Sequence, residues 1–249
     1  MRASGSEPHP ASEPTEGAAF VRLEGALTPL PAWRAAQWLA TRAPSVRRRL
    51  IGGALSLLSA GRSLHPTFGA GRDALRTSFL ALEGLSRDRL EILGEDYARE
   101  HLLPAVTPEA RRLLDEARAR SRRPVLIAET PSVIAAPLAA ALGIDEVIAN
   151  ELAFEGDRCT GELGGELIGP ELDPRQLARH AERLGVALAA SAAYGATGAD
   201  RLLLGAVGWP CALHPDAELA RLARDLDWPI VGPMRAPLAA LGGLGEAWR

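Results

Sequence analysis

The sequence predicts an α/β protein in which a parallel sheet is interrupted, just after its first strand, by a helical insertion. Along residues 119–233, short apolar runs bounded by Gly and Pro alternate with amphipathic segments, a pattern typical of a helix-covered parallel sheet. Residues 31–118 instead repeat apolar residues at spacings of three and four, which predicts helices throughout. We therefore expect an α/β core formed by residues 17–30 and 119–233, with residues 31–118 as a helical cap.

The first expected strand is the buried run "GAAFVRL", residues 17–23. In the helical segment that follows, Ser86 and Thr107 are residue types that cap helix N-termini, so helices are predicted to begin after them. "RRPVLIAETPS" returns to a buried strand that ends at Pro131. The later elements are a helix at 133–144, a strand and hairpin at 146–163, a helix at 173–186, a strand and loop at 188–200, a helix at 201–208, a strand at 209–215, a helix at 216–227 and a strand at 228–231.

Composition describes a globular chain. Of 249 residues, 47% are hydrophobic and the net charge is -3, which excludes a general nucleic-acid binder. The 28 basic residues are all Arg, so no lysine ammonium is available to any site. Cys159 and Cys211 are expected to be buried free thiols. Residues 1–16 are expected to be a disordered leader and 234–249 a C-terminal tail; no transmembrane segment is predicted, and a cytoplasmic location is expected.

Four stretches, in order, carry a family resemblance. They are "AAFVRLEGALTP" at 18–29, "VLIAETPSVIA" from residue 125, "TGEL" at 160–163 and "YGATGAD" at 194–200. With them the chain resembles the haloacid dehalogenase (HAD) superfamily, in its phosphoserine-phosphatase-like branch (subfamily IB). The resemblance extends over residues 17–233 and implies a Rossmann-like core with an inserted all-helical cap of the C1 type.

The resemblance also implies a catalytic apparatus, much of which this sequence lacks. The family's first strand ends in an Asp-x-Asp pair that supplies the aspartyl nucleophile and a proton donor. Arg22 and Glu24 stand at those positions, and a guanidinium stays protonated at neutral pH. The family's second-motif Ser or Thr is Ala128, with Thr130 two residues later.

The third and fourth motifs are altered as well. The third is a Lys, for which Arg175 is the nearest cation. The fourth supplies metal-binding carboxylates, where Ala196 replaces one Asp and Asp200 retains another. Two carboxylates balanced by two arginines make a poor magnesium site, because Mg²⁺ needs several hard oxygen ligands. No cofactor is expected, and magnesium is expected only if the protein is an active enzyme.

Two interpretations of Arg22 remain open. It forms an ion pair with Glu24 or Asp200 in an abandoned pocket, or it binds a phosphate or carboxylate ligand. Glu129 and Ser132 are weak candidates for a replacement nucleophile, because the sequence shows no base beside them. The predicted ligand-binding set is Arg22, Glu24, Thr130, Arg175, Thr197 and Asp200.

Three functional hypotheses follow. The first is a pseudophosphatase that acts as a binding or regulatory module. The second is an active hydrolase with altered acid-base chemistry at Glu24 and Asp200. The third is a structural protein partner of an active relative. A separate possibility is that the basic run 47–49, beside the apolar segment 50–61, contacts an anionic membrane surface.

Overall fold

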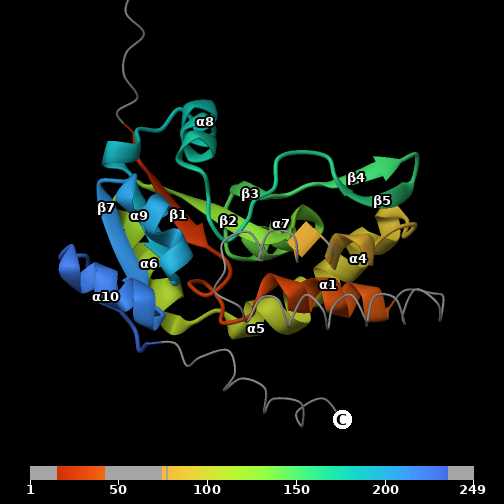
Figure 1. Cartoon of the computed structure of the whole chain (residues 1–249), viewed down its shortest axis with the longest axis horizontal. Helices are drawn as coiled ribbons and strands as arrows, with labels where there is room; N and C mark the ends of the chain where they lie inside the picture. The colour runs from red at the N-terminus through yellow and green to blue at the C-terminus, as the bar shows by residue number, and fades with distance from the viewer. Residues whose placement is uncertain (1–15, 43–74, 77, 235–249) are drawn as a thin grey trace, which may run out of the picture.

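The computed structural model describes residues 16–42, 75–76 and 78–234. Its centre is a six-stranded sheet with the strand order β3-β2-β1-β6-β7-β8 (Figure 1). All neighbouring strands are parallel, as predicted. The strands are β1 (Ala18–Arg22), β2 (Arg123–Pro131), β3 (Glu146–Asn150), β6 (Ala192–Gly195), β7 (Trp209–Leu213) and β8 (Ile230–Val231).

Side chains alternate along β1 between two buried layers. Ala19 and Val21 pack on one face, whereas Ala18 and Phe20 pack on the other. Because both faces are covered, the strand is apolar throughout, as the sequence indicated. The first layer contains residues of α6 (Pro108–Ala119) and α7 (Ser132–Ala141), and the second contains residues of α8 (Pro174–Leu184), α9 (Arg201–Gly205) and α10 (Ala217–Asp225).

Within the described part of the insertion, every element is helical. Ser86 and Thr107 accept hydrogen bonds from backbone N–H groups at the starts of α4 and α6, which confirms both predicted caps. α6 contacts β2, so the last helix before β2 covers the sheet, while α4 packs on α7. The other described elements are α1 (Ala32–Thr41), α4 (Arg87–Tyr97), the π-helix η1 (Ala98–Leu102) and α5 (Leu103–Ala105).

Several sequence predictions lie outside the described residues: most of the leader, most of the tail, the basic run 47–49 and the apolar segment 50–61. The division into core and cap at residues 31 and 118 stays a prediction. Where the structure describes the chain, no helix is long and apolar enough to cross a membrane. Cys159 and Cys211 are both buried and unpaired, as expected.

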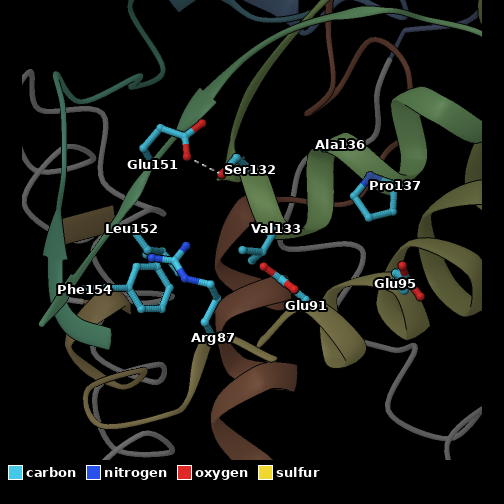
Figure 2. A pocket seen from close by; sticks show the side chains of 10 residues that line it. All are labelled: Arg87, Glu91, Glu95, Ser132, Val133, Ala136, Pro137, Glu151, Leu152 and Phe154. Atoms are coloured by element: carbon cyan, nitrogen blue, oxygen red, sulfur yellow. Dashed lines mark hydrogen bonds between the residues drawn. The ribbon is translucent and has the colours of Figure 1, made fainter. Parts of the chain in front are cut away.

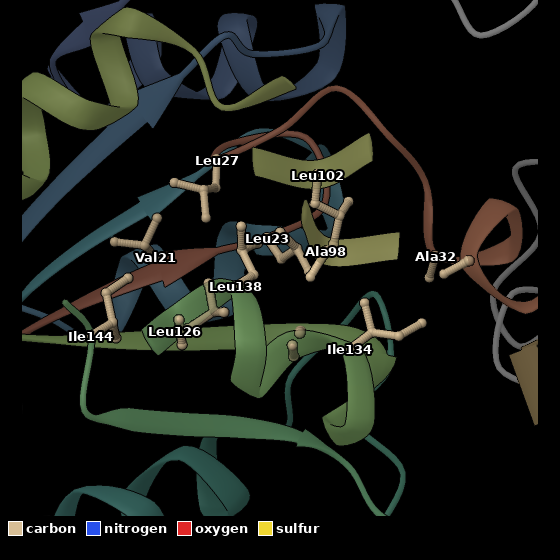
Figure 3. Packing of buried hydrophobic residues seen from close by; sticks show 14 of the residues in the cluster. Val21, Leu23, Leu27, Ala32, Ala98, Leu102, Leu126, Ile134, Leu138 and Ile144 are labelled. Atoms are coloured by element: carbon tan, nitrogen blue, oxygen red, sulfur yellow. The ribbon is translucent and has the colours of Figure 1, made fainter. Parts of the chain in front are cut away.

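The turn that follows β1 rests on a packed apolar platform. Figure 3 shows Leu23 and Leu27 from this turn close to Leu102 of η1, with Leu126 of β2 and Leu138 of α7 below them. All five side chains are at most 2% exposed. This packing fixes the carboxyl end of β1. A separate antiparallel hairpin, β4 (Leu152–Glu155) and β5 (Arg158–Leu163), extends from the sheet, and the short 3-10 helices η2 (Leu188–Ala190) and η3 (Gly198–Asp200) flank β6.

Candidate functional site

Polar side chains meet at the carboxyl ends of β1, β2 and β6, the edge at which parallel α/β sheets bind ligands. Arg22 is the last residue of β1 and is only 2% exposed. Its carbonyl accepts a hydrogen bond from the N–H of Leu27, which closes the turn. Gly25 has a φ of 92° in this turn, a conformation that favours glycine. The turn thereby places Glu24 beside the end of β2.

The Arg22 guanidinium is held by two carboxylates and two carbonyls. Its Nε lies 2.9 Å from Oδ1 of Asp200, and its Nη2 lies 3.0 Å from Oε1 of Glu129. Nη2 also donates to the carbonyls of Gly169, at 3.1 Å, and Pro170, at 2.9 Å. The predicted ion pair with Asp200 is confirmed. The second carboxylate is Glu129, not Glu24, which the sequence had suggested as the alternative.

The Glu24 carboxylate accepts hydrogen bonds from residues at the end of β2. Its Oε1 accepts hydrogen bonds from the N–H and the hydroxyl of Thr130, at 2.9 and 2.8 Å. Its Oε2 accepts from the N–H of Glu129 at 3.0 Å. Both carboxylate oxygens are therefore engaged by the protein, and Thr130, predicted to contact a phosphoryl group, binds Glu24 instead.

Asp200 is engaged at both oxygens as well. Oδ2 accepts from the N–H groups of Ala196, at 2.8 Å, and Thr197, at 2.9 Å, and lies 3.2 Å from the Thr197 hydroxyl. Oδ1 faces Arg22. A Cβ atom at Gly195 would lie 2.6 Å from the Asp200 Cβ, so glycine is required for this close return of the chain.

Three carboxylates around one cation shift the ionisation of the cluster. Burial lowers the pKa of Arg22, but the charges of Asp200, Glu129 and Glu24 outweigh burial and raise it. Burial and the charge of Glu24 raise the pKa of Glu129 to about 8, although Arg22 acts in the opposite direction. The Arg22 guanidinium is thus charged at neutral pH, and Glu129 keeps its proton to a higher pH than a free glutamate does.

The structure places Arg175 away from the contacts of Arg22 and adds a carboxylate beside Ser132. Arg175 is exposed on the first turn of α8, and no contact joins it to Arg22, Glu24 or Asp200 in the described chain. The cluster therefore contains one cation and three carboxylates rather than two of each. A carboxylate also lies beside Ser132, since its hydroxyl donates to Oε2 of Glu151 at 2.7 Å.

Sequence reasoning missed two members of the network, Glu129 as a partner of Arg22 and Asn150 at the end of β3. The Asn150 side chain is fully buried and donates to the carbonyls of Glu129, at 2.7 Å, and Ile168, at 2.8 Å. Its Oδ1 accepts from the N–H of Ile168 at 2.9 Å. Asn150 thereby holds the segment that presents the Gly169 and Pro170 carbonyls to Arg22. A lone polar residue at the end of an apolar strand was the only sequence signal for it.

A family model for haloacid dehalogenase-like hydrolases matches residues 24–204. The chain belongs to this family. Among curated relatives, the inhibition of morphological differentiation protein of Streptomyces azureus is 28% identical over 161 residues, 58% of each chain. The histidinol-phosphatase of Neisseria meningitidis is 26% identical over 164 residues, 63% of this chain and 72% of that protein. This chain thus matches less than two thirds of the Streptomyces protein's length.

Solved structures show the same fold. A protein of unknown function from Bordetella pertussis has a TM-score of 0.77 at 23% identity, covering 88% of this chain and 99% of that one. A phosphoserine phosphatase trapped as a phospho-aspartyl intermediate analogue has a TM-score of 0.57 at 15% identity, covering 91% and 97%. The chain therefore shares the fold of this phosphatase structure. Arg22, Glu24, Ala128 and Asp200, the positions that the resemblance assigns to family motifs, lie at one edge of the sheet.

HAD phosphatases use Mg²⁺, but the residues at this edge do not fit it. A divalent cation needs several carboxylate or carbonyl oxygens directed at one point. Both oxygens of Glu24 and both of Asp200 already accept protein hydrogen bonds or face Arg22, and the sequence position that the resemblance gives to the first carboxylate is occupied by Arg22. In the ranges described, no group of three or more His, Cys, Asp or Glu side chains is arranged to hold a metal ion.

Proposed function

We propose that this chain is a pseudophosphatase, a HAD-family protein that has lost phosphoryl transfer and acts as a binding or regulatory module. The observation that carries the proposal is the pairing of Arg22 with Asp200 and Glu129. A guanidinium at the nucleophile position cannot attack phosphorus, and it directs its donors at a carboxylate of the metal motif. The paired cluster then serves to stabilise the fold.

An active hydrolase using Glu24 and Asp200 is the alternative, but their contacts work against it. A general base must reach the proton that it abstracts. The Glu24 carboxylate is turned toward the backbone of Glu129 and Thr130, with three hydrogen bonds holding it there. Asp200 is 2% exposed and bound to Arg22. Proton transfer by either carboxylate would require the cluster to open.

Phosphate binding at Arg22 is a second candidate, supported by one observation. Nη1 of Arg22 is buried and has no hydrogen-bond partner among the described residues. Against it, a phosphate would enter a cluster of three carboxylates and would have to compete with Asp200 and Glu129 for the guanidinium. Cytoplasmic location and assembly with a protein partner also stay proposals, because they rest on sequence alone.

The test is an activity assay with phosphoserine and p-nitrophenyl phosphate, with Mg²⁺ and with EDTA. We expect no magnesium-dependent turnover above background. Arg22→Asp alone should also be inactive, because Ala128 and Ala196 remain in place of family side chains. The quadruple variant with Glu24→Asp, Ala128→Ser and Ala196→Asp added should recover at most trace activity. EDTA-sensitive turnover by the unmodified protein would contradict the proposal.

The phosphate candidate is tested separately by thermal unfolding. If phosphate binds at Arg22, inorganic phosphate should raise the melting temperature of the unmodified protein more than sulfate-free chloride buffer of equal ionic strength does, and Arg22→Ala should lose that difference. The control variant is Arg175→Ala, which removes an exposed arginine on α8. If this variant keeps the phosphate-dependent shift of the unmodified protein, a general effect of lost positive charge is excluded.

A further inference from the structure

A pocket opens between α4, the start of α7 and the hairpin strand β4, with a cavity volume of about 380 Å³ (Figure 2). This volume is within the range of small-molecule sites, which span roughly 300–1,000 Å³. From its lining we infer that the pocket binds a small organic cation, an amine or guanidine carried on a short aliphatic chain. The inference goes beyond the proposed function, because no lining residue occupies a family-motif position.

The charge around the pocket is negative. Glu91 and Glu95 extend from α4, and Glu151 lies at the start of the hairpin. Arg87 is the cation of the lining, and its guanidinium lies 3.8 Å from the centre of the Phe154 ring. Figure 2 shows Arg87 turned toward Phe154 and away from Glu95. No ion pair joins Arg87 to these carboxylates in the described chain, so they remain available to a cationic ligand.

Apolar side chains supply the remaining surface. Val133 and Pro137 of α7 lie on one side of the pocket, and Leu152 and Phe154 lie on the other. An aliphatic chain would be shielded between these two sides while its charged end reached the carboxylates. Glu151 is oriented by the Ser132 hydroxyl, at 2.7 Å from its Oε2. The lining thus combines an apolar contact surface with an oriented carboxylate.

The wall between α4 and α7 is tightly packed. A Cβ atom on Gly94, one residue before Glu95, would lie 2.0 Å from the carbonyl oxygen of Val133. Gly94 is buried, as is Leu93 beside it. The two helices therefore hold the backbones at Glu91, Glu95 and Val133 in fixed relative positions.

The experiment is isothermal titration of the full chain with agmatine, which carries a guanidinium and an ammonium on a four-carbon chain. Neutral butylurea is the control ligand. Agmatine should bind, and its affinity should fall as the salt concentration rises. The Glu91→Gln/Glu151→Gln variant should bind agmatine about 2- to 25-fold more weakly, since each exposed ion pair contributes about 0.2–1 kcal/mol. Glu182→Gln, which removes an exposed carboxylate on α8, should bind like the unmodified protein.

A variant that is expected to increase the affinity for agmatine provides a second test. Arg87→Gln removes the cation of the pocket and should tighten agmatine binding about 1.5- to 5-fold. A peptide with one internal arginine, acetyl-Ala-Arg-Ala-amide, distinguishes a free ligand from a protein side chain. Binding of the peptide but not of agmatine would overturn the small-molecule inference and would assign the pocket to a cationic side chain of a protein partner. Equal binding of agmatine and butylurea, no binding of any cation, or no effect of Glu91→Gln/Glu151→Gln would overturn the inference.

Discussion

Replacing Arg22 by methionine tests whether the buried guanidinium stabilises the fold. Arg22→Met keeps an unbranched apolar stem but removes the charge that faces Asp200 and Glu129. Two carboxylates, with side chains 2% and 16% exposed, are then left without their cation. Removing one partner of a buried ion pair typically costs about 3–5 kcal/mol, which for a protein of this size corresponds to a melting-temperature loss of roughly 6–20 °C.

The assay is urea unfolding at pH 7, monitored by circular dichroism. Arg175→Met is the matched control, because it removes the exposed arginine of α8 and should change the free energy of unfolding by about 0.5 kcal/mol or less. Adding Asp200→Asn to Arg22→Met should restore part of the loss, because one uncompensated charge disappears while a side-chain oxygen remains for the N–H groups of Ala196 and Thr197.

The pH dependence provides an independent check. Without the guanidinium, nothing opposes the burial and the charge of Glu24 that raise the pKa of Glu129, so the folded protein favours the protonated form of Glu129 more strongly. Stability that depends on protonation is lost as pH rises, and Arg22→Met should therefore lose more free energy of unfolding at pH 8 than at pH 5. A loss below about 1 kcal/mol at both pH values would refute the idea that Arg22 stabilises the cluster.

Three further predictions concern neighbouring features. The pKa of Glu129 is raised from 4.5 to about 8, so the stability that its protonation contributes is present below pH 4.5 and is lost as pH rises through 8. Glu129→Gln should remove this part of the pH dependence of the free energy of unfolding, measured by urea titrations across the window. Asn150→Ala should cost about 2–3 kcal/mol and speed hydrogen exchange in the loop before α8, which an unchanged exchange rate would contradict. Gly94→Ala should destabilise by about 1–3 kcal/mol because its Cβ would meet the Val133 carbonyl, whereas Gly205→Ala, with open space around it, should not destabilise; calorimetry compares the two.

The order of elements was predictable because the apolar patterns were strong and local. A strand buried on both faces reads as a continuous apolar run, and "AAFVR" and "PVLIA" met that description. The helix starts at Ser86 and Thr107 followed from side-chain capping. The meeting of Arg22 and Asp200 followed from topology, since the carboxyl ends of neighbouring parallel strands lie together.

The contacts that the sequence does not predict depend on loops. The sequence indicates Arg175 as the nearest cation, whereas in the structure Asp173 caps α8 and Arg175 lies exposed on its first turn. The carbonyls of Gly169 and Pro170 contact Arg22 because Asn150 fastens the segment that carries them. No local pattern encodes that contact, which joins residues far apart in the chain.

Glu129 shows how an irregularity in a strand changes the chemistry of a site. Strict alternation would place Glu129 on the face opposite Ala128 and Thr130. The pairing of β2 with β3 shifts register between Ile127 and Pro131, and within this stretch the N–H groups of both Glu129 and Thr130 point at Glu24. The Glu129 carboxylate meanwhile reaches Arg22. The irregular end of β2 therefore lets one segment bind the Glu24 carboxylate through its backbone and pair with Arg22 through its side chain. Both oxygens of Glu24 are satisfied in this way, whereas Nη1 of Arg22 has no hydrogen-bond partner among the described residues.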